Sequence, residues 1–204
     1  MASSIEVFAD ITCPFAHVGL KQVVRHVATM DDPADIFVRA WPMEWVNGAP
    51  LAADTITTEA KALEDQLGVH DFSGLRADRW PATSIPALNL VAAAYERDAA
   101  TGLAVSLELR AALFELGGDI SAPDALGSIA AAHDLALPDT EPSKAVQREY
   151  DDGKARGVQG SPHFFVGADS FFCPTLDLGK DSQGRLTARI DRTVLAEFFA
   201  RIDR

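Results

Sequence analysis

The residue types best suited to chemistry lie near the N-terminus, in the run ADITCPFAHVGL (residues 9–20). A short β-rich run leads into Cys13, and Pro14 begins an apolar pattern with helical spacing. Proline is favoured in the first helical turn because its missing N–H would be unpaired there anyway. Cys13 would then stand at a helix N-terminus, where unpaired N–H groups favour an anion. This predicts a thiol with a lowered pKa that acts as a nucleophile near neutral pH. The alternative is a buried, inert cysteine.

A second feature is the run GVQGSPHFFV (residues 157–166), where Ser161-Pro162 comes just ahead of a β-rich stretch. Proline cannot donate to a strand ladder, and a turn in this place is a natural position for a cis peptide bond. By itself this dipeptide predicts only a turn.

The first elements of the chain predict a β-α-β unit. Ile5–Ala9 reads as a strand, a helix follows from Pro14, and Asp35–Met43 reads as a second strand broken at Pro42. Strands joined in this way pair in parallel through a right-handed crossover. The helix is expected to end at Asp31–Pro33.

The middle of the chain predicts helices without a convincing strand, and the end returns to strands. We expect helices over 57–68, 84–100, 103–117, 122–133 and 143–157. A hairpin is expected from strands at 163–167 and 170–174, followed by a helix over 191–202. The sequence therefore predicts an α/β frame formed by residues 1–50 and 150–204, with residues 51–149 as an inserted helical subdomain.

Length and composition limit the class of protein. The 204 residues are 48% hydrophobic, which suits one globular domain with a sizeable core. A net charge of −12 disfavours nucleic acid as a partner. We expect no signal peptide and no membrane span, and hence a cytoplasmic protein. Two cysteines do not make a disulfide scaffold.

Taken together, the strand-Cys-Pro-helix start, the long helical middle and the GVxGxP-x-F loop resemble the DsbA-like thioredoxin-fold family over nearly the whole chain. Residues 82–98 and 112–135 resemble its cytosolic branch, which includes 2-hydroxychromene-2-carboxylate isomerases and kappa-class glutathione transferases. The resemblance implies a thioredoxin-like fold with a large all-helical insertion. It also implies that Pro162 is a cis-proline lying against Cys13, and that the backbone of Ser161 can pair with an extended thiol substrate.

The motif Cys13-Pro14-Phe15-Ala16 departs from the oxidoreductase branch at its fourth residue, which is the resolving cysteine there. In the isomerase and transferase branch the motif is typically Ser-Pro-aromatic-small. A mixed disulfide on Cys13 would therefore need a second thiol for its release. A low-molecular-weight thiol such as glutathione or mycothiol, not tightly bound, could supply it. Cys173 is the internal candidate, and the alternative is an ordinary strand cysteine.

Four further residues are candidates for a substrate site. His17 and His163 are expected near the thiol, where either could polarise or protonate it, and the alternative is a solvated polar residue at the rim. No compact ligand spacing supports a metal, so we expect none. Trp80 and Asn89 could form a wall for a small ligand, or belong to an ordinary helix start with a packed tryptophan.

The leading hypothesis is a DsbA-like thiol oxidoreductase that works through the single nucleophile Cys13, by monothiol exchange or thiol transfer. The alternatives are a thiol-dependent isomerase or glutathione-transferase-like enzyme, in which Cys13 only positions a bound thiol, and a non-catalytic binding protein. The expected partner is a small-molecule thiol or disulfide, and the protein is expected to be a homodimer.

Overall fold

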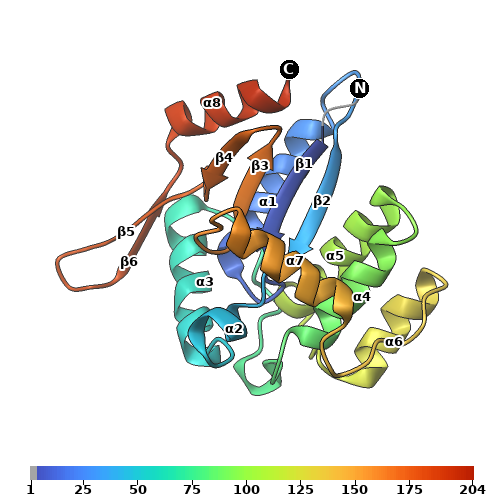
Figure 1. Ribbon diagram of the computed structural model, residues 1–204. Coiled ribbons are helices and arrows are strands. Elements are labelled where there is room, and N and C mark those ends of the chain that lie inside the picture. The colour runs from blue at the N-terminus through green and yellow to red at the C-terminus, as the bar shows by residue number, and fades with distance from the viewer. Residues whose placement is uncertain (1–3) are drawn as a thin grey trace.

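A mixed four-stranded sheet forms the centre of the computed structural model, which describes residues 4–204 (Figure 1). The strands lie in the order β2-β1-β3-β4. β1 pairs in parallel with β2, and β3 pairs antiparallel with both β1 and β4. The strands are β1 Ser4–Ala9, β2 Asp35–Ala40, β3 His163–Val166 and β4 Asp169–Phe172.

The predicted β-α-β start is confirmed. Helix α1 spans Pro14–Val27 and connects the parallel strands β1 and β2. The second strand ends at Ala40, so its predicted extension to Met43 is wrong. Pro42 has no N–H to donate to a ladder, and it instead forms the N-cap of the short helix α2, Met43–Asn47.

All the helices predicted between the second and third strands are present, with shifted ends. The segment contains α3 Ala53–Leu67, the 3-10 helix η1 Ala77–Arg79, α4 Ile85–Tyr95, α5 Ala99–Phe114, α6 Pro123–Ala132 and α7 Lys144–Ala155. The boundary between α4 and α5 falls earlier than predicted. The Asp98 side chain accepts from the backbone N–H of Thr101 and so caps α5 at its start.

A second hairpin was not predicted. Strands β5, Asp177–Lys180, and β6, Leu186–Arg189, form a two-stranded sheet that extends from the left side of the molecule in Figure 1. The Gln66 side chain of α3 holds it, with hydrogen bonds to the carbonyl of Leu186 and the N–H of Ala188. The terminal helix α8, Arg192–Ile202, follows as predicted.

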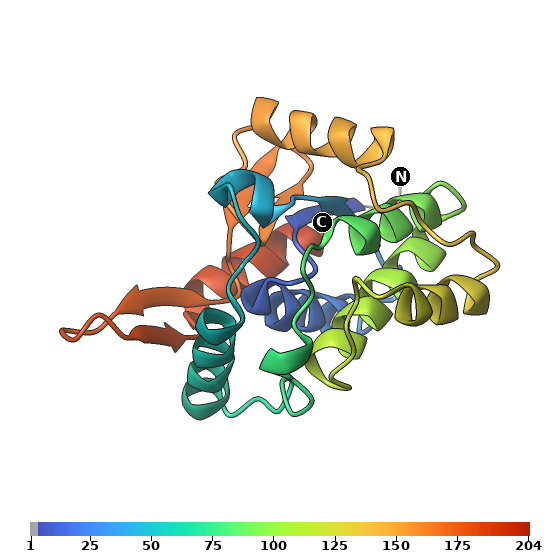
Figure 2. The same cartoon turned by 90° about the horizontal axis from the view of Figure 1, so that it is seen from below.

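Helices cover both faces of the central sheet. Helices α1 and α8 lie on one face and α7 on the other (Figure 2). Strand β1 alternates accordingly: Ile5 and Val7 pack in one cluster with residues of α1 and α8, whereas Phe8 packs on the other side with Trp41 and Tyr150. A separate core, built mainly on α3, α4 and α5, fills the helical segment.

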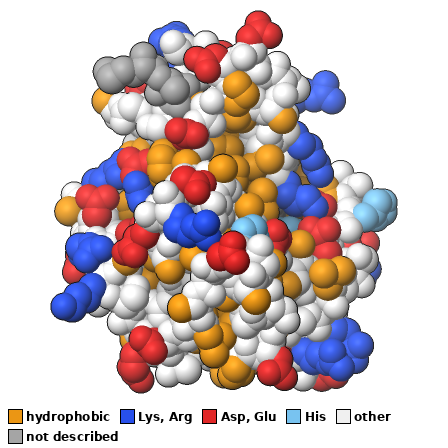
Figure 3. All heavy atoms as spheres, turned by 90° about the vertical axis from the view of Figure 1, so that its right-hand side faces the viewer, with side chains coloured by type: hydrophobic (Ala, Val, Ile, Leu, Met, Phe, Trp, Pro, Cys, Tyr) orange, Lys and Arg blue, Asp and Glu red, His pale blue; other side chains and the backbone are white. Residues whose placement is uncertain are grey.

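Surface charges of both signs are intermixed on the face shown in Figure 3, with hydrophobic side chains between them. None of the helices formed by residues 4–204 has the length and apolar character needed to cross a membrane.

Candidate active site

Cys13 is the N-cap residue of α1, directly before Pro14. The residue is only 4% exposed, and its Sγ donates to the carbonyl oxygen of Ser161 at 3.1 Å. The Ser161–Pro162 peptide bond is cis. The two sequence features singled out above, 148 positions apart, therefore meet at one sulfur atom.

The charge state of Cys13 differs from the expectation. Burial raises the pKa of the thiol to about 11, although the Ser161 side-chain hydroxyl, the backbone N–H of Ala16 and the charge of Arg110 all act to lower it. The predicted lowered pKa is wrong, because desolvation of a buried thiolate outweighs the favourable helix N-terminus. At neutral pH Cys13 is a protonated thiol and not a ready nucleophile.

Asp10 organises the turn that carries Cys13. Its carboxylate is 1% exposed and accepts four hydrogen bonds: two from Thr12, through N–H and Oγ1 at 2.8 Å each, one from the N–H of Met43 at 2.6 Å, and one from Ser84 Oγ at 3.0 Å. Its own N–H donates to Ser161 Oγ at 3.0 Å. Asp10 thus joins β1, α2, the start of α4 and the cis-proline loop.

Arg110 of α5 lies beneath the same turn and is fully buried. Its Nη1 donates to the carbonyl oxygen of Asp10 at 2.8 Å and has a longer contact of 3.4 Å to that of Ile11. Sequence reasoning missed both Asp10 and Arg110. The available signals were an aspartate directly after a buried strand and an arginine inside the apolar run of a helix.

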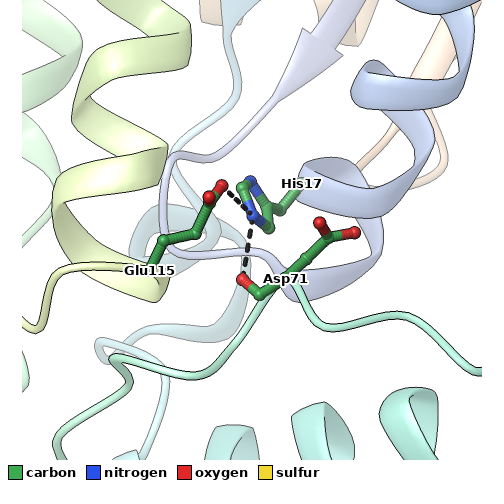
Figure 4. A group of neighbouring side chains, drawn as sticks. All are labelled: His17, Asp71 and Glu115. Atoms are coloured by element: carbon green, nitrogen blue, oxygen red, sulfur yellow. Dashed lines mark hydrogen bonds and ion pairs between the residues drawn. The ribbon is translucent and has the colours of Figure 1, made fainter.

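His17 does not serve the thiol. Figure 4 shows its Nε2 directed at the carbonyl oxygen of Asp71, 3.2 Å away, and at Glu115 Oε1, 3.3 Å away. The ring lies against Phe72 and Phe114. Burial, together with the charges of Arg110 and Lys21, lowers the pKa of His17 to about 3. His17 is therefore neutral at pH 7, and the expectation that it polarises or protonates Cys13 is not supported by its contacts.

The same cluster is the one group of His, Cys, Asp and Glu side chains in residues 4–204 that could converge on a metal ion. Ligand atoms of His17, Asp71 and Glu115 lie within 4.8 Å of one another. Lys21 Nζ, however, lies 2.5 Å from Asp71 Oδ1 and 3.0 Å from Glu115 Oε1. The lysine ammonium already supplies the positive charge that the two carboxylates would offer to an ion.

His163 and Asn89 are engaged elsewhere. His163 Nδ1 accepts from the N–H of Gln159 at 3.0 Å, and its Nε2 lies 2.8 Å from Ser170 Oγ. Asn89 donates twice from Nδ2, to the carbonyls of Asp139 and Glu141, and its Oδ1 accepts from the N–H of Ser143. The geometry gives Asn89 a structural role in holding the loop before α7.

Trp80 lies closer to the turn. Its Nε1 donates to the carbonyl of Leu51 at 2.7 Å, and its ring helps to line a small cavity beside Asp10, Thr12 and Ser84. The cavity volume is about 10 Å³, enough for roughly one water molecule.

Cys173 approaches the site from β4. Its N–H donates to the carbonyl of Pro162 at 3.0 Å, and its backbone is in the left-handed region with φ of 47°. Both cysteines are free thiols. Burial, and then the nearby Cys13, raise the pKa of Cys173 to about 12. Cys13 contacts the carbonyl of Ser161 and Cys173 that of Pro162, so the two cysteines lie at neighbouring residues of one loop without being bonded to each other.

Residues 4–190 match the family model described as a DSBA-like thioredoxin domain. The chain belongs to the DsbA-like thioredoxin-domain family. This confirms the resemblance, and with it the thioredoxin-like fold with its helical insertion. No curated protein sequence matches the chain.

Solved structures similar to this DsbA-like domain share its fold at low sequence identity. A "probable DsbA oxidoreductase" from Streptomyces coelicolor is 19% identical, with a TM-score of 0.63 over 83% of this chain and 82% of that one. The cytosolic disulfide reductase DsbM from Pseudomonas aeruginosa, with GSH, is 16% identical, with a TM-score of 0.59 over 83% and 89%. A 2-hydroxychromene-2-carboxylate isomerase is 14% identical, with a TM-score of 0.59 over 82% and 87%.

Proposed function

We propose that this DsbA-like domain is a thiol-dependent isomerase or transferase, in which a bound low-molecular-weight thiol supplies the reacting sulfur and Cys13 holds it as a hydrogen-bond donor. The observation that carries the proposal is the placement of the Cys13 sulfur, which is buried at the start of α1 and lies 3.1 Å from the carbonyl oxygen of Ser161. Burial raises its pKa to about 11, which agrees with a neutral thiol. A thiol has one proton to donate, so on binding of the small thiol the Cys13 S–H would turn from the Ser161 carbonyl to the bound sulfur, as a hydroxyl would in the Ser-Pro-aromatic-small motif. Ala16 agrees with that motif because it adds no second thiol.

Exchange chemistry is less well supported. Because burial raises its pKa to about 11, Cys13 carries far less thiolate at pH 7 than free cysteine does. The higher intrinsic nucleophilicity of a basic thiolate compensates for only part of this deficit. The low exposure of Cys13 further hinders the approach of a disulfide to the sulfur.

Monothiol exchange remains the second candidate, because the N–H of Ala16 and the charge of Arg110 both favour the thiolate. In that reaction the Cys13 thiolate attacks the disulfide of an oxidised small thiol, forms a mixed disulfide and releases one thiol. A second small thiol then attacks the mixed disulfide, restores Cys13 and leaves as part of a new disulfide.

Glutathione or mycothiol fits the proposed partner, and we place the enzyme in the cytoplasm, where such thiols are kept reduced. Support comes from the shared fold of DsbM, which was solved with GSH. Gln159 is exposed, whereas Ser161 is buried and its carbonyl accepts from Cys13. An extended thiol peptide would have to displace that contact to pair with the Ser161 carbonyl.

The test is the binding of reduced glutathione, and separately of mycothiol, to wild type, Cys13→Ser and Cys13→Ala by calorimetry and native mass spectrometry. Cys13→Ser keeps a donor and should bind within about threefold of wild type. Cys13→Ala loses a hydrogen bond to a charged sulfur, of roughly 1.5–3 kcal/mol, and should bind at least tenfold more weakly. The variant Cys173→Ser, with the second thiol removed, serves as the matched control.

Two other outcomes discriminate between the candidates. A covalent adduct on Cys13 after treatment with glutathione disulfide, absent in Cys13→Ser and without non-covalent binding of the reduced thiol, would favour monothiol exchange. Binding of neither reduced thiol and no adduct would contradict both enzyme proposals and leave a non-catalytic binding protein.

A further inference from the structure

Arg110 is tied to the backbone that carries Cys13. The guanidinium Nη1 and the backbone N–H of Cys13 converge on one acceptor, the carbonyl oxygen of Asp10, at 2.8 Å and 3.4 Å. This carbonyl is held in place because the Asp10 carboxylate is itself bound by Thr12, Met43 and Ser84. The position of the arginine relative to the cysteine is therefore fixed by the turn.

The Arg110 guanidinium has hydrogen-bond donors without partners among the described residues. Arg110 has no exposed surface, and its Nε and Nη2 find no hydrogen-bond partner among the described residues. A buried cation whose hydrogen bonds go to neutral carbonyls is expensive, because burial removes the hydration of its charge. Burial accordingly lowers the pKa of Arg110 to about 10. Such a cation gains most from a negative charge that forms nearby.

The ionisable groups that face this cation come from several elements. Asp10 at the end of β1, Cys13 and His17 on α1, and Tyr95 on α4 all interact with the charge of Arg110. Cys173, directly after β4, interacts electrostatically with Cys13. His17 is neutral at pH 7, the Asp10 carboxylate already accepts four hydrogen bonds, and the Tyr95 hydroxyl is bonded to the backbone of Val38 and Ile36. The group whose charge can change at this position is therefore the sulfur of Cys13.

We propose that Arg110 is a positioning residue that supplies the buried positive charge for a sulfur anion at the Cys13 site. For Cys13 itself the inference stands without any assumption about the reaction. For a thiolate bound against Cys13 it rests on the proposed function. The guanidinium acts on the sulfur through its charge, and its own hydrogen bonds go to backbone carbonyls of the turn. Because Arg110 is fully buried, water does not screen this charge.

The test compares Arg110→Met and Arg110→Lys in a Cys173→Ser chain, which leaves Cys13 as its one cysteine. The rate of alkylation of Cys13 by iodoacetamide is measured between pH 8 and pH 10 by intact mass. Arg110→Met should alkylate at least tenfold more slowly at each pH, whereas Arg110→Lys, which keeps the charge, should stay within about threefold of the parent. The matched control is Ser106→Ala, another fully buried polar residue, one turn earlier on α5.

Equal rates for Arg110→Met and its parent would overturn the inference, as would an equal slowing in Ser106→Ala. Should Arg110→Met fail to fold, the Arg110 Nε signal, followed by carbon-detected NMR in the Cys173→Ser chain, provides a second readout. This signal should shift as Cys13 ionises and stay unchanged in a Cys13→Ser, Cys173→Ser chain. A signal that is identical in both chains would contradict the proposal. Neither measurement requires glutathione, so the result is independent of the proposed function.

Discussion

The thiol of Cys13 donates a hydrogen bond to the carbonyl oxygen of Ser161, the residue whose bond to Pro162 is cis. This contact joins the start of α1 to the loop before β3, and it occupies the S–H in a buried place. The proposed function follows from this placement, because burial keeps the sulfur neutral at the N-terminus of α1.

The buried carboxylate of Asp10 should contribute strongly to stability. In Asp10→Asn the amide can accept at one atom only, and its NH₂ group would face the donors of Met43 and Ser84. We expect a loss of about 3 kcal/mol in the free energy of unfolding, measured by urea denaturation. Ser84→Ala removes a single one of the four bonds and should cost roughly 1 kcal/mol. Equal losses in the two variants would show that Asp10 has no organising role.

His17 should make the fold sensitive to acid. Its pKa is lowered from 6.5 to about 3, so the folded state favours the neutral ring. The stabilisation is complete above pH 6.5 and is lost as the pH falls toward 3, at up to about 1.4 kcal/mol per pH unit. In His17→Gln, whose amide can still donate to Asp71, the unfolding free energy should fall less steeply between pH 6 and pH 4. The exposed His70→Gln is the control, and identical slopes for His17→Gln and wild type would refute this account.

Ala16 stands where a dithiol enzyme would have its second cysteine, so replacing it with cysteine should create a dithiol site. Ala16→Cys places a second thiol in the first turn of α1, where the N–H of residue 16 already faces the Cys13 sulfur. After treatment with glutathione disulfide, we expect an internal disulfide, detected as the loss of two hydrogens by intact mass, and a gain of disulfide reductase activity. Ala16→Ser is the size-matched control. A stable glutathione adduct in place of the internal disulfide would show that the two positions cannot be bridged.

The sequence predicted those parts of the site that depend on local signals. The apolar spacing after Pro14 was enough to place Cys13 at the start of α1, and the family resemblance linked it to Ser161 and Pro162. The roles of Asp10 and Arg110 could not be predicted, because their hydrogen bond joins residues 100 positions apart. The error in the direction of the Cys13 pKa has the same origin: a helix N-terminus can be identified from local sequence, whereas burial depends on the packing of distant elements.

The second hairpin was missed for a related reason. Strands β5 and β6 are short and largely exposed, so they lack the alternating apolar pattern that indicates a strand. Contacts with Gln66 of α3 hold the hairpin, and they cannot be predicted from local sequence because Gln66 lies about 120 positions before its partners in the hairpin. Asn89 shows the converse. Its polar side chain suggested a ligand wall, but the backbone of the loop before α7 takes both of its amide donors and one lone pair of its oxygen.

The most direct test of the central claim is the pH titration of Cys13 in the Cys173→Ser chain, by alkylation kinetics with intact-mass detection. The account predicts a rate that rises about tenfold per pH unit through pH 10, with a midpoint near a pKa of about 11. A midpoint at or below the value of free cysteine, about 8.5, would contradict it and return Cys13 to the role of an activated nucleophile.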